Sequence, residues 1–227
     1  MLSKNKSTVA EGRKSWLVSA MALGVYGRTK SSRIRSLLRK IVLKAEGGPM
    51  YSRTAREIFA RFHGIEVGMY TIGPCEADPY RFPSGTRIGR YSSIYWTARI
   101  VADIEAYGAS ATNGFPSHSA LTGKAVGTAV PTGIVIGHDV FVGHNAIIFT
   151  SAGQIGDGAF IGAGTVVQNP VPPFAVVMGN PARVVRYRFS EPKIKEISEL
   201  GWWLKSLEEL SIERSEFQKP LEGDSIM

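Results

Sequence analysis

Hydrophobic residues recur every six positions through the middle of the chain. Ile88, Ile94 and Ile100 are six residues apart, and the same spacing returns later in the sequence. Most of these residues are followed by glycine, and the fourth residue after each is small or β-branched. This period is typical of a parallel β-helix built from hexapeptide repeats. The later members of the series are Ile136, Val142 and Ile148, and then Ile155, Ile161 and Val167.

The spacing has a simple physical reason. If each six-residue unit is a short strand and a turn, three units close a triangular coil, and the apolar side chain points inward and stacks on the next coil about 4.8 Å along the axis. Glycine at the next position relieves crowding and permits a positive φ at the corner. One coil cannot bury its own apolar faces, so several coils must stack. From Ile148 to Ile155 the step is seven residues, which predicts a bulge at that corner.

A long excursion, Ile104–Gly133, interrupts the repeat. It includes the stretch ASATNGFPSHSALTG, which lacks the six-residue period and contains His118. The repeat continues in phase on both sides, which disfavours an ordinary β-sandwich with chance spacing. The excursion is therefore expected to leave the coil and return to it, and its histidine is a candidate for chemistry.

A helical period precedes the repeat. Five apolar residues fall at i, i+3, i+4, i+7 and i+8, and arginine and lysine crowd the remaining positions. Such a basic amphipathic helix either lies on an anionic membrane surface or docks its apolar face on the protein's own body, with the basic residues in solvent. The apolar positions are Ile34, Leu37, Leu38, Ile41 and Val42.

Two further N-terminal segments have a recognisable pattern. A short helix is predicted over Thr54–Phe62, where Thr54 and Glu57 have the spacing of a capping box. His63, which follows it, is expected to be a surface or capping residue. Earlier in the chain, basic residues precede the apolar run Trp16–Gly27, a shape that resembles a signal peptide. The run is too short to span a bilayer as a helix, which needs ~20 apolar residues.

Composition narrows the classes of partner and chemistry. The 227 residues carry a formal net charge of +8, but the basic excess lies largely near the N-terminus and around Arg183–Lys195, and no nucleic-acid-binding motif is legible. The single cysteine, Cys75, excludes an internal disulfide and a multi-cysteine zinc site, as expected in a reducing cytoplasm. His138 and His144 occupy equivalent positions on successive faces of the coil, pointing outward. This placement argues against a shared metal site.

The last coils resemble a known family. The stretch Ile136–Phe189, which begins IGHDVFVGHNAIIFTSAGQIGDGAFIGAGTVV and ends GNPARVVRYRF, is similar to the terminal coils of hexapeptide-repeat acyltransferases, in the xenobiotic and polysaccharide O-acetyltransferase branch. With FPSGTRIGRYSSI before it and RFSEPKIKEISELGWW after it, the similarity covers Arg33–Trp203.

The resemblance implies an architecture. The fold is expected to be mainly β, a left-handed parallel β-helix with N-terminal and C-terminal helices, assembled as a homotrimer with active sites between subunits. The expected division is an N-terminal helical region (1–63), the β-helix domain (64–189) with its excursion (104–133), and a C-terminal helix and tail (190–227).

In this branch the excursion bears the catalytic residue. Relatives read approximately N-H-P-x-D-x-x-S-x-H-P, and the first histidine is the general base that takes the proton from the acceptor hydroxyl. When the chain is aligned on the second histidine, here His118, the first has become Ser110, and an unassisted serine cannot serve as this base. Three roles stay open for His118: a recruited catalytic base, a structural residue like its counterpart, or a residue without catalytic duty. Ser110 and Asn113 are candidates for binding the acceptor.

The resemblance also implies a channel for acetyl-CoA. In relatives the pantetheine arm lies in the groove between adjacent prisms, and basic side chains near the C-terminal end meet the phosphates. Phe141 stands where most relatives carry a tryptophan beside the acceptor. The alternative for the arginines is that they only solvate the last coil. The implied cofactor-binding residues are His144, Ala163, Gly164, Gln168, Asn169, Arg183 and Arg186.

The predicted function is transfer of an acetyl group from acetyl-CoA to a sugar hydroxyl in surface-polysaccharide or lipopolysaccharide synthesis, with no metal. The expected partners are a homotrimer and a small-molecule or glycan acceptor, with no nucleic acid. The expected location is the cytoplasm, at the inner membrane surface if the basic helix contacts it. Two alternatives remain: a non-catalytic acyl-CoA-binding or scaffolding trimer that has lost the catalytic histidine, and an antibiotic O-acetyltransferase.

Overall fold

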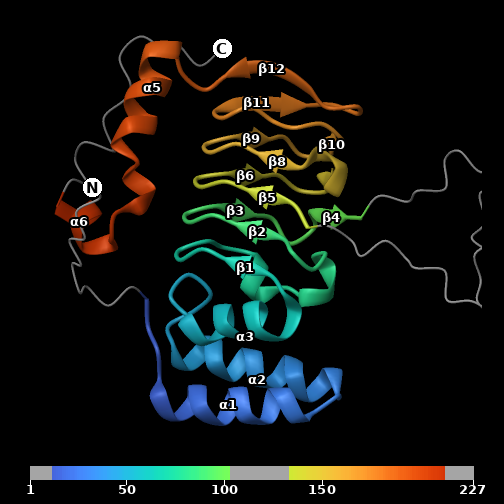
Figure 1. Cartoon of the computed structure of the whole chain (residues 1–227), viewed down its shortest axis with the longest axis vertical. Helices are drawn as coiled ribbons and strands as arrows, with labels where there is room; N and C mark the ends of the chain where they lie inside the picture. Colours follow the sequence, from blue (N-terminus) through green and yellow to red (C-terminus); the bar gives the residue numbers. More distant parts are fainter. Residues whose placement is uncertain (1–11, 103–132, 213–227) are drawn as a thin grey trace, which may run out of the picture.

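Three parallel sheets form the faces of a triangular prism in the computed structural model, which describes residues 12–102 and 133–212 (Figure 1). This arrangement confirms the predicted parallel β-helix. Ser110, Asn113 and His118 lie outside the described residues. The first face holds β1 (Glu66–Val67), β2 (Arg87–Ile88), β5 (Val135–Ile136) and β8 (Gln154–Ile155). The second holds β3 (Ser93–Ile94), β6 (Phe141–Val142), β9 (Phe160–Ile161), β11 (Ala175–Met178) and the antiparallel β12 (Arg183–Tyr187). The third holds β4 (Arg99–Val101), β7 (Ile147–Phe149) and β10 (Val166–Val167).

The six-residue series forms the core of the prism. Each of its members is buried, and equivalent residues of successive coils are in register, as Ile88 is with Ile136 and Ile136 with Ile155. The described small residues four positions further on are also buried, except Ala98, which is partly exposed. The chain leaves the coil after β4 and re-enters at β5, and the pairing of β2 with β5 and of β4 with β7 continues across this interruption. The excursion therefore does not disturb the stacking of the coils.

The glycines that follow the core residues serve close packing and not the corner conformation. None of these glycines has a positive φ; the residue two positions later has it instead, as at Tyr91, Asp139 and Asn145. A Cβ on Gly89 would lie 2.5 Å from the carbonyl carbon of Gly137 in the next coil. The expected relief of crowding is confirmed, and the expected positive φ at these glycines was wrong. The residue with positive φ comes two positions later, because the glycine itself lies directly against the backbone of the next coil.

Replacing Gly89 by alanine is therefore expected to lower the free energy of unfolding by ~1–3 kcal/mol, because the new methyl group has only backbone to displace. The measurement is urea unfolding followed by circular dichroism at one protein concentration. The matched control is Gly24→Ala in α1, where the Cβ would meet only the flexible end of Arg28 at 3.4 Å. That change is expected to be neutral or to stabilise by ~0.5–1 kcal/mol. A Gly89→Ala protein as stable as this control would contradict the packing explanation.

The seven-residue step between Ile148 and Ile155 is absorbed by a turn. Residues Thr150–Ala152 form a 3₁₀ helix, η5, which ends at Gly153 with φ +67. The bulge expected at this corner takes the form of this turn, and the extra residue falls between strands and not within one. Both flanking strands keep their register with neighbouring coils.

Three helices close one end of the prism: α1 (Trp16–Arg28), α2 (Ser32–Ala45) and α3 (Arg53–His63) (Figure 1). No helix among the described residues is long and apolar enough to cross a membrane. In α2 the alternative in which the apolar face docks on the protein, with the basic residues in solvent, holds only in part. Val42 is buried, but Ile34, Leu37 and Ile41 are exposed, whereas Arg39 is buried. Tertiary contacts with Tyr26 of α1 decide this orientation, since Arg39 donates a hydrogen bond to its hydroxyl at 3.0 Å.

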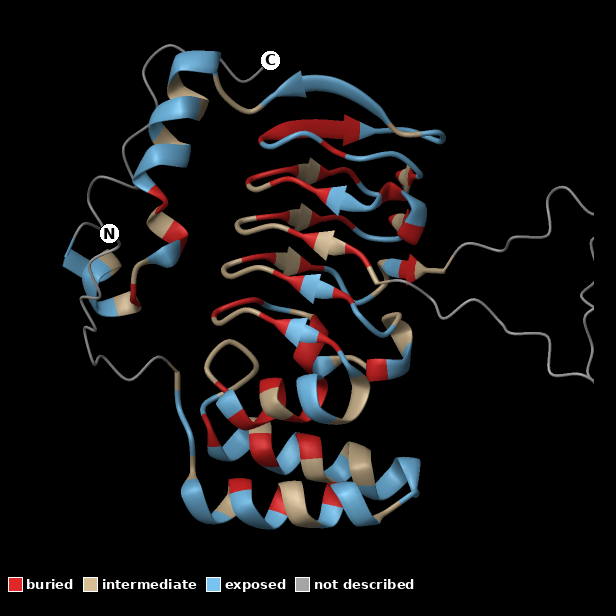
Figure 2. Cartoon of the chain, viewed as in Figure 1, coloured by how far each residue is buried: buried red, intermediate tan, exposed pale blue. Residues whose placement is uncertain are grey.

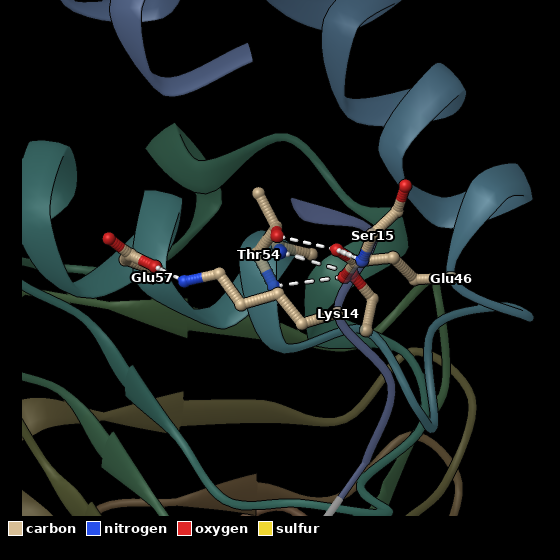
Figure 3. A network of polar contacts seen from close by, with 7 residues as sticks. Lys14, Ser15, Glu46, Thr54 and Glu57 are labelled. Atoms are coloured by element: carbon tan, nitrogen blue, oxygen red, sulfur yellow. Dashed lines mark hydrogen bonds and ion pairs between the residues drawn. The ribbon is translucent and has the colours of Figure 1, made fainter. Parts of the chain in front are cut away.

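A buried carboxylate links the three helices. Glu46, which follows α2, accepts hydrogen bonds from the backbone N–H of Ser15 at 3.0 Å and of Thr54 at 3.0 Å (Figure 3). It also accepts from the hydroxyls of Ser52 at 2.7 Å and Thr54 at 2.6 Å. The predicted capping box at Thr54 and Glu57 was wrong. Ser52 is the N-cap, because its hydroxyl accepts from the N–H of Ala55, and the Thr54 hydroxyl is already directed to Glu46.

The C-terminal part runs back along the coil as α5 (Glu191–Leu200), η6 (Trp202–Leu204) and α6 (Leu207–Ile212) (Figure 1). The buried ring of Trp203 stacks on His138, with centroids 6.0 Å apart and planes 6° apart. The backbone carbonyl of Lys205 accepts from the Arg90 guanidinium at 2.9 Å and from the Tyr91 hydroxyl at 3.1 Å. These contacts cover the corner between the first and second faces.

Candidate functional site

The other described corner that bears aromatic and imidazole side chains joins the second and third faces. The turns after β3, β6 and β9 stack there, which places Trp96, His144 and Ala163 in successive coils. The N–H of Gly164 donates to the carbonyl of His144 at 2.8 Å. The N–H of Asn145 donates to Thr97 Oγ1 at 2.9 Å. The corner lies next to β4, from which the chain departs into the excursion.

His144 is exposed and held by specific neighbours. Its Nδ1 lies 3.0 Å from Thr97 Oγ1, and its ring centroid lies 3.9 Å from that of Tyr95 and 6.5 Å from that of Trp96. With the proton on Nδ1, the imidazole donates to Thr97 and leaves Nε2 free to accept a proton. The Thr97 contact therefore gives His144 an orientation, and the tautomer that donates to Thr97 is the one suited to a base.

An aromatic wall extends from this corner across the second face. Tyr95 meets Phe141 edge-on with centroids 5.5 Å apart, and Phe141 stacks on Phe160 at 4.5 Å. Tyr95, Trp96 and Phe141 line a shallow cavity of about 320 Å³, together with Ile72, Glu76 and Ser93. Trp96 is 71% exposed and Tyr95 is 41% exposed. The cavity thus offers ring faces, with His144 beside it.

The structure divides the predicted cofactor residues into two groups. Ala163 and Gly164 lie at the same corner as His144, and both are exposed. Arg183 begins β12 opposite Met178, directly after Ala182, whose N–H donates to the carbonyl of Val166. Gln168 and Asn169 follow the other end of β10 and so lie across the third face from His144 within one chain. Arg186 pairs with Val176 over the middle of the second face.

Two other candidate side chains belong to the framework. His138 points outward from the coil as expected, where Trp203 covers its ring, and the Nδ1 of His138 accepts from the Arg90 N–H at 2.9 Å. Its pKa is lowered by burial, and the Arg90 charge adds to this effect. His63 is not a free surface or capping residue, because it hydrogen-bonds the Tyr26 hydroxyl at 2.8 Å.

Cys75 is not available as a nucleophile. It is buried, and burial raises the pKa of its thiol to about 11, so the thiolate is scarce at neutral pH. Within residues 12–102 and 133–212 no group of three or more His, Cys, Asp or Glu side chains could hold a metal ion.

The sequence also contains a signal for the aromatic pair Tyr95 and Trp96, because the pair interrupts the glycine pattern of the hexapeptide repeat. The turns after β2, β5, β6, β8 and β9 begin with glycine, but the turn after β3 begins with Tyr95 and continues with Trp96. A large aromatic side chain such as Tyr95, at the position where the fold prefers glycine, needs a reason outside the core. The cavity that it lines supplies one.

No family model matches the chain. Curated proteins do match it: a chloramphenicol acetyltransferase of Agrobacterium fabrum is 45% identical over 69 residues, which are 30% of this chain and 32% of the relative. A probable macrolide acetyltransferase of Lysinibacillus sphaericus is 43% identical over 76 residues, 34% of this chain and 42% of the relative. The matched part of the chain thus spans less than half the length of these relatives.

Solved structures match more of the chain at lower identity. A hexapeptide-repeat-containing acetyltransferase of Vibrio cholerae has 17% identity and a TM-score of 0.41, over 79% of this chain and 97% of that one. A soybean serine acetyltransferase has 20% identity and a TM-score of 0.42, over 76% of this chain and 85% of that one. The hexapeptide coils described above and the sequence matches agree: over the matched part, the chain is similar to named acetyltransferases and carries the coils of a hexapeptide-repeat β-helix.

Proposed function

We propose that the protein transfers an acetyl group from acetyl-CoA to an acceptor hydroxyl. The observation that carries this proposal is the corner where His144, Ala163 and Gly164 lie in successive coils beside an aromatic cavity, with Arg183 at the start of the last strand, β12. Exposed backbone at Ala163 and Gly164 suits the pantetheine arm, and the Arg183 guanidinium suits the phosphates of CoA. The names of the sequence relatives support the same chemistry.

The proposed reaction is a direct transfer. The acceptor hydroxyl attacks the thioester carbonyl, a base takes its proton, and the CoA thiolate leaves and is protonated. His118 is the proposed base, with His144 as the second candidate because its Nε2 is free in the tautomer described above. A covalent acetyl-cysteine is not part of the scheme, since Cys75 is buried.

The active assembly we propose is a homotrimer of left-handed coils with the site between neighbouring subunits. The third face supports this arrangement, because it presents partly exposed apolar side chains where a soluble surface would carry polar ones. They are Ile147, Phe149 and Val166. We propose a cytoplasmic location, where acetyl-CoA is available as co-substrate.

The acceptor we propose is a sugar hydroxyl in surface-polysaccharide or lipopolysaccharide synthesis. Aromatic faces such as those of Tyr95 and Trp96 suit the apolar face of a sugar ring. A xenobiotic alcohol is the second candidate, favoured by the relatives named as chloramphenicol and macrolide acetyltransferases. A non-catalytic acyl-CoA-binding trimer is what remains if the chain binds CoA but transfers nothing to either class of acceptor.

Arg183→Ala is expected to weaken CoA binding on the order of tenfold, because it removes a charge-assisted hydrogen bond to phosphate. Isothermal titration of the wild type and the variant is the measurement, repeated at raised salt, which should weaken wild-type binding. The matched control is Arg87→Ala, an exposed arginine on the first face. A wild type that binds no CoA would end the acyltransferase proposal.

A further inference from the structure

The helical end of the molecule turns its apolar side chains outward. In α1 the buried residues are Ser19, Ala22 and Tyr26, whereas Trp16 is 76% exposed and Met21 is 71% exposed. A helix docked only to its own protein normally has the opposite pattern, with large apolar side chains inside. The outward side of α1 therefore has a composition that suits a second, apolar environment.

The same inversion occurs in α2. Arg39 points inward to the Tyr26 hydroxyl, and the Arg35 guanidinium lies over the Tyr26 ring at 5.0 Å from its centroid. Outward stand Ile34, Leu37 and Ile41, at i, i+3 and i+7 of one helical face. Two neighbouring helices thus each expose a row of apolar side chains while guanidinium groups occupy inward positions.

The charge around these rows has one sign. Residues 13–45 contain nine Lys and Arg and no Asp or Glu. Seven of these basic residues are exposed, among them Arg33 and Lys40 on α2. We call the exposed apolar and basic side chains of residues 13–45 the basal surface. It lies at the end of the molecule opposite β12 (Figures 1 and 2).

We propose that the basal surface docks on an anionic lipid bilayer. Its apolar side chains enter the interface between headgroups and acyl chains, and its lysines and arginines meet lipid phosphates. This is the mode of binding of basic amphipathic helices that lie in the plane of a membrane. Each basic residue near an anionic surface contributes about 1 kcal/mol of attraction, so several together hold a protein at the bilayer surface.

Charge also favours a lipid bilayer over a second copy of the chain as the partner of the basal surface. If two basal surfaces met face to face, each set of basic residues would oppose another with no acidic residue from 13–45 to compensate it. An anionic lipid surface supplies both the missing negative charge and the apolar layer. The inference goes beyond acetyl transfer, and it holds or fails independently of the acceptor.

The test is co-sedimentation of the full chain with vesicles. The wild type is expected to sediment with vesicles of equal parts phosphatidylglycerol and phosphatidylcholine, to do so less at raised salt, and to stay in solution with phosphatidylcholine alone. The double change Arg33→Gln and Lys40→Gln should weaken binding on the order of 30-fold. The double change Leu37→Ser and Ile41→Ser should weaken it at least on the order of tenfold.

The matched controls remove two positive charges, or one apolar side chain, from surfaces outside residues 13–45. Arg87→Gln with Lys195→Gln removes two exposed charges from the coil and α5, and Leu204→Ser polarises an apolar side chain that is 65% exposed in η6. Both controls should bind vesicles like the wild type. The proposal is overturned if the wild type does not bind the anionic vesicles, or if the controls lose binding as much as the basal variants. It is also overturned if the basal changes alter the mass in light scattering and leave vesicle binding intact, which would indicate a second copy or a protein partner.

Discussion

Glu46→Gln is expected to lower the free energy of unfolding by about 3 kcal/mol, because a glutamine cannot accept what this buried carboxylate accepts. Each carboxylate oxygen receives one backbone N–H, from Ser15 or from Thr54, and one hydroxyl (Figure 3). The hydroxyls can rotate, but the N–H groups cannot. In glutamine an NH2 group replaces one of the two oxygens. This NH2 group is a donor, and it would face the backbone N–H of Ser15 or of Thr54, which is a donor too.

Urea unfolding at a single protein concentration measures this effect. Figure 3 also shows the matched control, Glu57→Gln, which breaks the ion pair of Glu57 with Lys14 at 2.8 Å. Both side chains of that pair are more than a third exposed, so its loss should change the free energy of unfolding by less than about 1 kcal/mol. Equal losses for the two variants would show that the carboxylate of Glu46 is not the element that joins the three helices.

His118→Ala is expected to cut turnover on the order of 10²-fold while CoA affinity stays nearly unchanged. A proton-transfer group acts in the transition state and contributes little to binding the cofactor. Steady-state kinetics gives the turnover, and isothermal titration gives the affinity. If His118 has only a structural role, the change should lower thermal stability or trimer content instead.

Two further variants separate the routes by which the proton leaves. Ser110→His restores the residue that relatives carry and should raise turnover if its loss has made the enzyme slow. His144→Ala tests the other imidazole, which the structure places beside Tyr95 and Thr97. Full turnover in His118→Ala together with loss of turnover in His144→Ala would transfer the role of base to His144.

The coil could be predicted because its determinants are local and repeated. Ile88, Ile136 and Ile155 occupy the same position in successive coils, and this repetition makes the six-residue period recognisable in the sequence. The place of the corner that bears His144 followed from the same periodicity, whereas its role in binding CoA is implied only by the resemblance and stays a prediction. Residues such as Ala163 and Gly164 hold fixed places in a repeat, so their position relative to His144 could be inferred from the spacing of the sequence alone.

The framework between the elements could not be predicted, because long-range partners decide it. The period of α2 indicates an apolar face, but the hydroxyl of Tyr26 draws Arg39 inward and turns Leu37 outward. Ser52 became the cap because Glu46 engages Thr54. His138 is covered by Trp203, which is far away in the sequence. In each case a partner that no local pattern identifies outweighs the local preference.

The uninterrupted register across the excursion has a consequence for how such enzymes diversify. The strands before and after it remain paired with their neighbours, so the coil does not depend on the length or content of the inserted segment. For a flexible insertion, each doubling of length costs only about 0.6 kcal/mol in closure entropy. A lineage can therefore exchange or remodel this segment while the paired strands of the coil are inherited intact. A serine at position 110, where the resemblance places the histidine of relatives, is a change of the kind that this separation permits.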